Sequence, residues 1–490
     1  MTVHFPFDNS YSRLPDRFFV RQIPAVVAAP KLIRLNRDLA VELGLDPEQL
    51  STPEGIDILA GRTIPDGAEP IATVYAGHQF GNFVPQLGDG RAILLGEVVG
   101  QDGIRRDIQL KGSGRTPFSR MGDGRSALGP VLREYVVSEA MAALGVRTTR
   151  SLAAVSTGET VVREIPLPGA VLTRVASSHI RVGTFQFFAA RGDFDAVRLL
   201  ADHVIARHYP EAAGAERPYQ ALLEAVVRAQ ADLVAQWMLI GFIHGVMNTD
   251  NMSIAGETID YGPCAFMDEY NPQTVLSSID AYGRYAYGNQ PSMAHWNLVR
   301  LAETLLPLMS SEPEVAVKQA EEALAVFETV FSDALFAGLS RKLGLFEARD
   351  NDRELARDLL NLMNDNGADF TLAFRALADA AEENEAPLRS RFVVPAALDP
   401  WLQRWRLRLG EEKQSDAERS AAMRTVNPMY IPRNHRIEAV IRAAIDHDDF
   451  GPFHELLAVL SRPYDDQPAF AHYAEPPTSE ERVLQTFCGT

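Results

Sequence analysis

Cysteine is scarce in this chain, whose 490 residues include only Cys264 and Cys488. Two thiols are too few for a disulfide framework or a zinc cluster. The N-terminus lacks a basic start followed by an apolar run, and nowhere do about 18 apolar residues follow one another without interruption, so we expect neither a secretory signal nor a membrane span. The resulting expectation is a cytoplasmic protein with no membrane partner.

Basic residues are also in short supply, with 47 lysines and arginines against 65 acidic residues and a formal net charge of −18. An acidic surface repels phosphate backbones, so the sequence predicts no nucleic-acid partner. A local basic pocket for a nucleotide is still compatible with this charge. Hydrophobic residues make up 46% of the chain, enough for a large core that needs no disulfides, and we expect a monomer.

The order of local patterns divides the chain into four segments. Residues 1–70 form an N-terminal extension, and residues 71–176 form a β-rich region with one main helix. Residues 177–310 are mainly helical with two polar loops, and residues 311–490 form a helical C-terminal extension. A β-rich region followed by a mostly helical one predicts an α+β fold of two lobes with a ligand cleft between them.

Individual elements follow from spacing and from helix-ending residues. Leucines at helical spacing predict a helix within residues 31–45. Pro130 suits the first turn of a second helix and Gly145 suits its end. Further predicted elements are strands over 148–157 and 159–176, a helix over 221–245, and a short strand pair within 253–262.

A lysine and a glutamate give the first chemical signal. Lys111 ends a predicted strand, and Glu134 lies on the helix that follows. In a nucleotide site, a strand lysine neutralises phosphate oxygens and a helical carboxylate holds its ammonium group in place. Taken alone, the two residues are more typical of a surface lysine and a solvated glutamate.

Glycines gather around Lys111. They are Gly88, Gly90, Gly112, Gly114, Gly122 and Gly124. Glycine lets backbone N–H groups approach phosphates closely, although ordinary hairpin turns explain the same pattern equally well. No GxxxxGK[ST] motif occurs, which excludes a Walker A loop.

The most informative segment is HGVMNTDN (244–251), which is followed by DYG (260–262). Asn251 and Asp260 offer the hard oxygen ligands that Mg²⁺ prefers, and a hairpin between them would bring them together. Kinase-like enzymes hold Mg²⁺ with an Asn after the catalytic loop and with the Asp of a DFG triplet. The spacing therefore favours a metal site over a plain polar loop.

One position departs from the kinase pattern. Alignment of His244 and Asn251 with the catalytic loop of kinases places Val246 where the catalytic base, an Asp, stands in those enzymes. Valine cannot accept a proton. Asp250 lies on the same loop and can act as a base from a different angle. The pattern thus indicates either different chemistry or an inactive site, and His244 is expected to brace the loop.

Arginines follow the same regions of the sequence. They are Arg91, Arg115, Arg120, Arg174 and Arg181. Guanidinium groups bind phosphate oxygens in pairs of hydrogen bonds, although ordinary surface pairing is an equal alternative for any one of them.

Long segments of the chain resemble selenoprotein O and its bacterial relatives. They are YAGHQFGNFVPQLGDGR, IQLKGSGRTPFSR, GDGRSALGPVLREY, HGVMNTDNMSI, DYGPCAFMD and NPMYIPRNHR, and the likeness runs from about residue 70 to the C-terminus. The resemblance implies a protein-kinase-like fold of the pseudokinase class, since the usual catalytic Asp is missing. It further implies a protein adenylyltransferase that binds ATP in a flipped orientation with Mg²⁺ or Mn²⁺. Such an enzyme transfers AMP to Ser, Thr or Tyr hydroxyls of target proteins and releases pyrophosphate.

The resemblance also implies roles for single residues. Lys111 would contact phosphate with Glu134 as its partner, Asp250 would accept the proton, and Asn251 and Asp260 would hold the metal. The residues implied to line the nucleotide are Gly88, Gly90, Arg91, Asp123, Gly124, Arg174 and Arg181. In a flipped orientation, the additional arginines would supply a cationic pocket for the β- and γ-phosphates.

Two alternatives to adenylyl transfer remain open. The chain could be a non-catalytic ATP-binding scaffold, or a conventional phosphotransferase that uses Asp250 as its base. Many relatives carry selenocysteine near the C-terminus, where this chain has Cys488. A regulatory disulfide from Cys488 to Cys264 is therefore a hypothesis, with two unlinked thiols in a reducing cell as an equal alternative.

Overall fold

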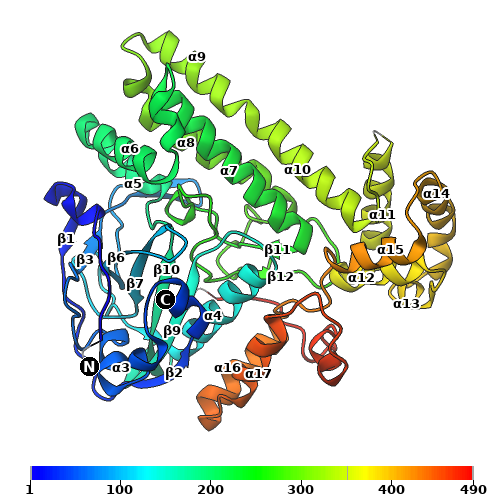
Figure 1. The fold of residues 1–490 in the computed structure, drawn as a ribbon, viewed down its shortest axis with the longest axis horizontal. Helices are drawn as coiled ribbons and strands as arrows, with labels where there is room; N and C mark the ends of the chain where they lie inside the picture. The colour runs from blue at the N-terminus through cyan, green and yellow to red at the C-terminus, as the bar shows by residue number, and fades with distance from the viewer. Residues whose placement is uncertain (1–2, 350, 488–490) are drawn as a thin grey trace.

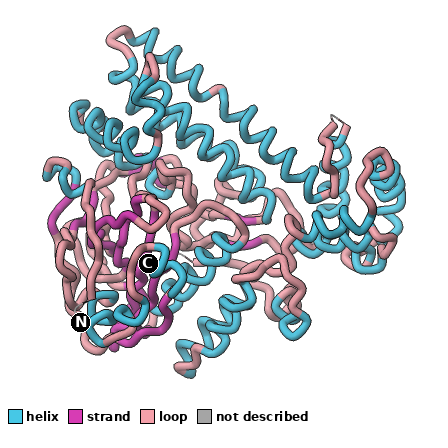
Figure 2. Tube along the Cα trace, viewed as in Figure 1, coloured by secondary structure: helices cyan, strands magenta, loops and turns pink. Residues whose placement is uncertain are grey.

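The central element is an antiparallel sheet of eight strands, as seen in a computed structural model that describes residues 3–349 and 351–487. Its strand order is β1 (Phe19–Arg21), β3 (Ile71–Thr73), β6 (Ala92–Val99), β7 (Arg105–Lys111), β10 (Pro166–Ala176), β9 (Arg150–Val162) and β2 (Lys31–Leu35), and the short β8 (Ser126–Ala127) also pairs with β10. Apolar side chains of β6, β7 and β10 are buried, which explains why these strands occupy the middle of the sheet. Figure 2 shows the strands gathered on one side of the molecule.

Residues before position 70 belong to this sheet as well. β1 and β2 form its two ends, and the short helices α1 (Arg37–Glu42), α2 (Pro47–Leu50) and α3 (Pro53–Leu59) follow β2. Apolar residues of these helices pack with Val98, Ile108 and Val155 of the sheet in one buried cluster. The N-terminal segment is therefore an integral part of the β-rich half.

The prediction of one helix within residues 31–45 is wrong for its first part. Lys31–Leu35 pairs with β9, where Lys31 lies opposite Ser156 and Leu35 opposite Ala153. Only after Asn36 does the chain turn helical, because the Asn36 side chain caps α1 by accepting the N–H of Leu39 at 3.2 Å. Pairing with a neighbouring strand has overridden the local helical spacing.

Helix α4 (Leu128–Ala143) packs against β9 and β10 and confirms the helix predicted from Pro130 and Gly145. Most residues of α4 are buried, and Glu134 is one of them. β9 and β10 confirm that two strands lie within residues 148–176, but the turn between them follows Val162 and not residue 157 as predicted. Strand and helix together thus carry Lys111 and Glu134 toward each other.

The remainder of the chain is mostly helical (Figure 1). Its helices are α5 (Val182–Ala189), α6 (Phe194–His208), α7 (Pro218–Ile240), α8 (Gln290–Met309), α9 (Pro313–Leu324), α10 (Val326–Lys342), α11 (Asp352–Asn366), α12 (Phe370–Ala381), α13 (Ala386–Arg389), α14 (Asp399–Leu409), α15 (Asp416–Arg424), α16 (Asn434–His447) and α17 (Gly451–Leu460). Helices α16 and α17 return from the C-terminal region and pack on α4. The main buried cluster accordingly joins the sheet, α4 to α8, α16 and α17, and a second cluster lies among α11 to α15.

One helical stretch of the described residues, Pro313–Lys342, is long and apolar enough to cross a membrane by length and composition alone. A core helix of a soluble protein can meet the same criterion. Within this stretch, α10 lies along α7, as Figure 1 shows.

Candidate functional site

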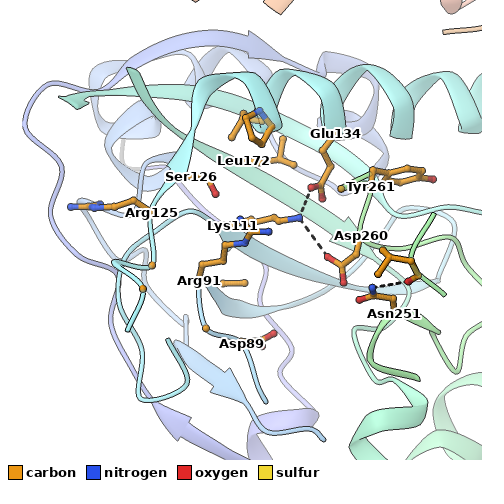
Figure 3. A pocket seen from close by; sticks show the side chains of 18 of the residues that line it. Asp89, Arg91, Lys111, Arg125, Ser126, Glu134, Leu172, Asn251, Asp260 and Tyr261 are labelled. Carbon is orange, nitrogen blue, oxygen red and sulfur yellow. Dashed lines mark hydrogen bonds and ion pairs between the residues drawn. The ribbon is translucent and has the colours of Figure 1, made fainter. Parts of the chain in front are cut away.

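A cavity of about 810 Å³ lies between the sheet with α4 and the loops that follow α7. All residues proposed from the sequence for the nucleotide, the metal and catalysis line it: Gly88, Gly90, Arg91, Lys111, Asp123, Gly124, Glu134, Arg174, Arg181, Asp250, Asn251 and Asp260. Residues from Gly88 to Asp260 therefore share one cavity, although their individual roles stay predictions. Figure 3 shows part of this arrangement.

Lys111 and Glu134 form the ion pair that the sequence suggested. Lys111 Nζ donates to Glu134 Oε2 at 2.5 Å, and both side chains are buried (Figure 3). Burial lowers the pKa of Lys111, and the charge of Glu134 opposes that change. The pair holds the ammonium group at the wall of the cavity, where an anionic ligand would meet it.

Asp260 contacts three cations at once. Its Oδ1 lies 2.7 Å from Arg174 Nη1 and 3.5 Å from Lys111 Nζ, and its Oδ2 lies 2.7 Å from Arg181 Nη1. Although burial acts in the opposite direction, Arg181, Arg174 and Lys111 hold the pKa of Asp260 well below its usual range. The carboxylate is therefore ionised, as a metal ligand must be.

The hairpin predicted within residues 253–262 is absent, and that prediction is wrong. Ser253 instead forms a β-bridge with Arg181, and Thr258 forms one with Thr148. The two flanks of the segment thus pair with other parts of the chain rather than with each other. A short antiparallel pair, β11 (Phe242–Ile243) with β12 (Ala265–Phe266), brackets the whole region and brings its ends together.

The loop after β11 carries Asp250 and Asn251 into the cavity. Asn251 Nδ2 donates to the main-chain oxygen of Val246 at 2.9 Å, which fixes the orientation of the carboxamide. Asp250 is 7% exposed, and its Oδ1 is buried without a hydrogen-bond partner among the described residues. Burial raises the pKa of Asp250 to about 6, against the lowering by a Gln79 hydrogen bond and by Arg181.

His244 braces this loop, as the sequence suggested. Its Nε2 lies 2.9 Å from the main-chain oxygen of Ile259, one residue before Asp260. Burial lowers the pKa of His244, so the neutral ring donates from Nε2 to that carbonyl. Tyr261, in the DYG triplet, is 2% exposed, and its hydroxyl shares a hydrogen bond with Thr148 Oγ1.

The glycine-rich segment closes the cavity on the other side. Gly124 has φ +69°, and a Cβ there would lie 2.2 Å from the main-chain oxygen of Gly114, so only glycine fits. Asp123 is bound by both terminal nitrogens of Arg163, at 2.9 and 3.1 Å. Arg163, which the sequence reasoning did not select, therefore fixes the position of Asp123.

The arginines divide into two groups. Arg91, Arg120, Arg174 and Arg181 line the cavity. Arg115 is not among the lining residues, and its guanidinium instead donates to the main-chain oxygen of Arg120 at 3.0 Å. Of the two alternatives left open for Arg115, the structure therefore favours local pairing, in which the side chain tightens its own loop.

Some lining residues were missed by the sequence reasoning. They are Tyr75, Gln79, Phe118, Glu438, Ile441, Ile445 and Phe487. Glu438, Ile441 and Ile445 come from α16, which is distant in sequence and carries no motif. Gln79 lies within YAGHQFGNFVPQLGDGR, a segment whose family likeness implied no role for this residue.

The structure describes one of the two cysteines, Cys264. Cys264 is buried, and burial raises its pKa, whereas Cys488 lies outside the described residues. The disulfide therefore stays a prediction. Thr486, close to the end of the described chain, donates from its hydroxyl to the main-chain oxygen of Pro263 at 2.6 Å.

The candidate metal ligands in this cavity are oxygen atoms. The described part of the chain contains no cluster of three or more His, Cys, Asp or Glu residues arranged for a metal. Asn251 and Asp260 both line the cavity and would offer two oxygen ligands. An ionised carboxylate with a carboxamide suits Mg²⁺, which keeps several positions for water and phosphate. These residues therefore fit a hard divalent cation.

Comparison with known proteins shows the family of the chain. Residues 2–461 match the family model described as "Protein adenylyltransferase SelO". The chain is 68% identical to a protein from Bradyrhizobium sp. (strain BTAi1), and 67% identical to one from Rhodopseudomonas palustris (strain HaA2) and one from Methylorubrum populi. Each is named "Protein nucleotidyltransferase YdiU", and each match covers 100% of both chains. The chain therefore belongs to the SelO family.

Proposed function

We propose that this protein is an adenylyltransferase that moves AMP from ATP to a Ser, Thr or Tyr hydroxyl of a target protein. One observation carries the proposal: a buried carboxylate, Asp250, lies in the same cavity as Asn251, Asp260 and a cluster of cations. The names of the relatives support nucleotide transfer to protein in general, and the choice of AMP rests on the family description.

Asp250 is proposed as the proton acceptor. Val246, at the position of the kinase base, offers no acceptor. Because burial raises the pKa of Asp250 to about 6, the carboxylate is ionised at neutral pH and still basic enough to accept a proton. The oxygen of the target hydroxyl would bond to the α-phosphorus, and its proton would pass to Asp250. The bond between the α-phosphorus and the oxygen that bridges to the β-phosphate would break, which releases pyrophosphate.

The cations of the cavity are proposed to bind the triphosphate. Lys111, Arg174 and Arg181 converge on Asp260, and Arg91 lines the same cavity. Guanidinium and ammonium groups that are already oriented stabilise charge that develops on a leaving pyrophosphate. Asn251 and Asp260 would hold Mg²⁺ or Mn²⁺, which supplies further stabilisation of phosphate charge when bound.

We further propose that the two halves correspond to the lobes of a protein-kinase-like fold. The antiparallel sheet with α4 carries the lysine and its glutamate, and the mostly helical half carries the loop with Asp250 and Asn251. The cavity lies where these halves meet. This is the arrangement in which kinases place the corresponding groups.

Labelled ATP tests the proposal. The protein would be incubated with a bacterial lysate depleted of nucleotides, a divalent cation and ATP labelled on either the α- or the γ-phosphate. Label from the α-position on protein is the expected result, and intact-mass analysis should show the addition of one AMP. Label from the γ-position alone would mean phosphorylation, and ATP binding without either label would mean a scaffold.

A further inference from the structure

A small β-hairpin reaches from the sheet side of the cavity to the loop that carries Asp250. It consists of β4 (Gly77–Gln79) and β5 (Asn82–Val84), joined by Phe80 and Gly81. Both turn residues have positive φ, 51° and 86°, which matches the backbone twist of a tight hairpin. Positive φ is costly for phenylalanine, and such strain persists only where surrounding contacts hold it.

The hairpin contacts three successive residues of the loop. The Phe80 N–H donates to Asn248 Oδ1 at 3.0 Å, the His78 N–H to Thr249 Oγ1 at 2.7 Å, and Gln79 Nε2 to Asp250 Oδ2 at 3.1 Å. Gln186 of α5 joins the group, because Thr249 donates to its Oε1 at 2.6 Å and its Nε2 lies 2.8 Å from His78 Nδ1. The position of the loop is thus set by the hairpin and not only by its own turns.

Asp250 is held on one oxygen and left open on the other. Gln79 occupies Oδ2, while Oδ1 is buried and has no hydrogen-bond partner among the residues described. Gly77 allows this close approach, since a Cβ there would lie 2.4 Å from Oδ1. Arg181 contacts Asp250 only through the main-chain oxygen, at 2.7 Å, so Gln79 is the one described side chain that hydrogen-bonds to the carboxylate.

We propose that Gln79 is a positioning residue for the transfer reaction. Its amide fixes the rotation of the Asp250 carboxylate and leaves Oδ1 with unused acceptor capacity for the proton of the incoming hydroxyl. Gln79 itself neither gives nor takes a proton in this step. The inference rests on the proposed function, because it concerns the group that accepts the proton there.

Two substitutions separate the effect of the Gln79 amide from the effect of side-chain length. Gln79→Met keeps the length of the side chain and removes the amide donor, whereas Gln79→Asn keeps an amide on a shorter side chain. Gln86→Met is the matched control, since Gln86 is exposed on the segment after the same hairpin and does not line the cavity. We expect kcat of Gln79→Met to fall by about 10- to 100-fold, with Gln79→Asn intermediate and Gln86→Met unchanged.

A role in positioning also predicts which constants stay the same. KM for ATP should remain within about twofold in Gln79→Met, because the residue acts on the acceptor side and not on the triphosphate. Gln79→Met should add little to the loss caused by Asp250→Asn, since both changes remove the same oriented carboxylate. Multiplicative losses in the double variant would instead show that Gln79 acts apart from Asp250.

The results distinguish this inference from the proposed function. If the wild type transfers the α-label and Gln79→Met retains its kcat, the inference is overturned while the function stands. A parallel rise in KM for ATP would also overturn it, since that pattern indicates general disruption of the cavity. A wild type that transfers no label to protein would overturn both.

Discussion

Charge in the cavity converges on a single residue, Asp260, which is the only acidic group that contacts Lys111, Arg174 and Arg181 together among the described ion pairs. Removing one member of a buried charge cluster leaves the others without compensation. Substitution of Asp260 should therefore lower the stability of the fold as well as weaken the binding of the metal that this residue is proposed to hold.

Asp260→Asn is expected to lower the transfer of AMP at least about 100-fold, since it removes the charged metal ligand. It should also lower the free energy of unfolding by roughly 3 kcal/mol, because buried Arg181 loses its carboxylate partner and Arg174 keeps only the longer contact with Glu134, at 3.4 Å. Transfer of α-label and denaturant unfolding measure the two effects. Asp232→Asn, at a side chain that is 46% exposed, is the control, and activity of Asp260→Asn equal to that control would contradict the proposed metal role.

A different residue, Glu257, should make stability depend on pH. Its carboxylate accepts hydrogen bonds from the N–H and hydroxyl of Ser177, and burial raises its pKa from 4.5 to about 7. An acid whose pKa is higher in the folded state stabilises the protein in its protonated form, so this contribution is full below pH 4.5 and disappears as the pH rises through about 7.

Glu257→Gln should therefore flatten the fall in unfolding free energy between about pH 5 and pH 8, by roughly 1–2 kcal/mol because the side chain is partly exposed. Urea titrations at several pH values measure this. Glu224→Gln, on the exposed face of α7, should leave the slope unchanged. An unaltered slope in Glu257→Gln would show that Glu257 is ionised throughout.

At the scale of elements, the hairpin β4–β5 and helix α4 place the two sides of the site. α4 is anchored on the sheet and on α16 and α17, so its glutamate is held by extensive packing. The hairpin is small and depends on close contacts with the loop that carries Asp250, and a Cβ on Gly77 would lie only 2.4 Å from Asp250 Oδ1. A single methyl group should therefore be enough to disturb it.

Gly77→Ala should reduce transfer by about 10-fold or more, because the new Cβ would displace the Asp250 side chain. Its φ is not positive, so the backbone itself accepts alanine, and binding of ATP should stay close to that of the wild type. Gly214→Ala is a suitable control, since nothing lies within 4 Å of a Cβ there. Equal loss in both variants would argue against a specific contact.

The elements also show what sequence reasoning can and cannot reach. α4, β9 and β10 were predicted because their spacing and helix-ending residues are local signals. The hairpin expected within residues 253–262 was wrong, since Ser253 and Thr258 pair with Arg181 and Thr148, partners that are far away in the chain. The residues of α16 that line the cavity were missed because they are also distant in the sequence. The residues that belong to motifs were predicted to share one cavity, and they do.

For the whole molecule, the important feature is that the cavity is lined from both halves. Lys111, Glu134 and Arg174 come from the sheet and α4, and Asp250 and Asn251 from the loop after α7. A ligand that contacts both halves stabilises the folded state by its binding free energy. Asp260, however, already contacts three cationic side chains of the protein itself.

Mg²⁺ and ATP should therefore stabilise the protein cooperatively. Mg²⁺ alone at millimolar concentration is expected to change the thermal midpoint by less than about 1 °C, because the cation must compete with Arg174 and Arg181 for Asp260. Mg²⁺ with ATP should raise the midpoint by several degrees, and by more than the sum of the separate effects. Differential scanning fluorimetry measures this, and strictly additive shifts would contradict the coupling.

The tyrosine of the DYG triplet has a consequence for inhibitor design. In kinases the phenylalanine of the DFG triplet, with which the sequence motif DYG was compared, can change its packing, and that packing distinguishes active from inactive states. Here Tyr261 is buried, and its hydroxyl is bonded to Thr148, so expelling the ring would leave a buried polar group unpaired as well as open a hole in the core. Drug-like compounds that require such an expulsion should bind this protein poorly, and screening is better directed at molecules that leave the ring in its place.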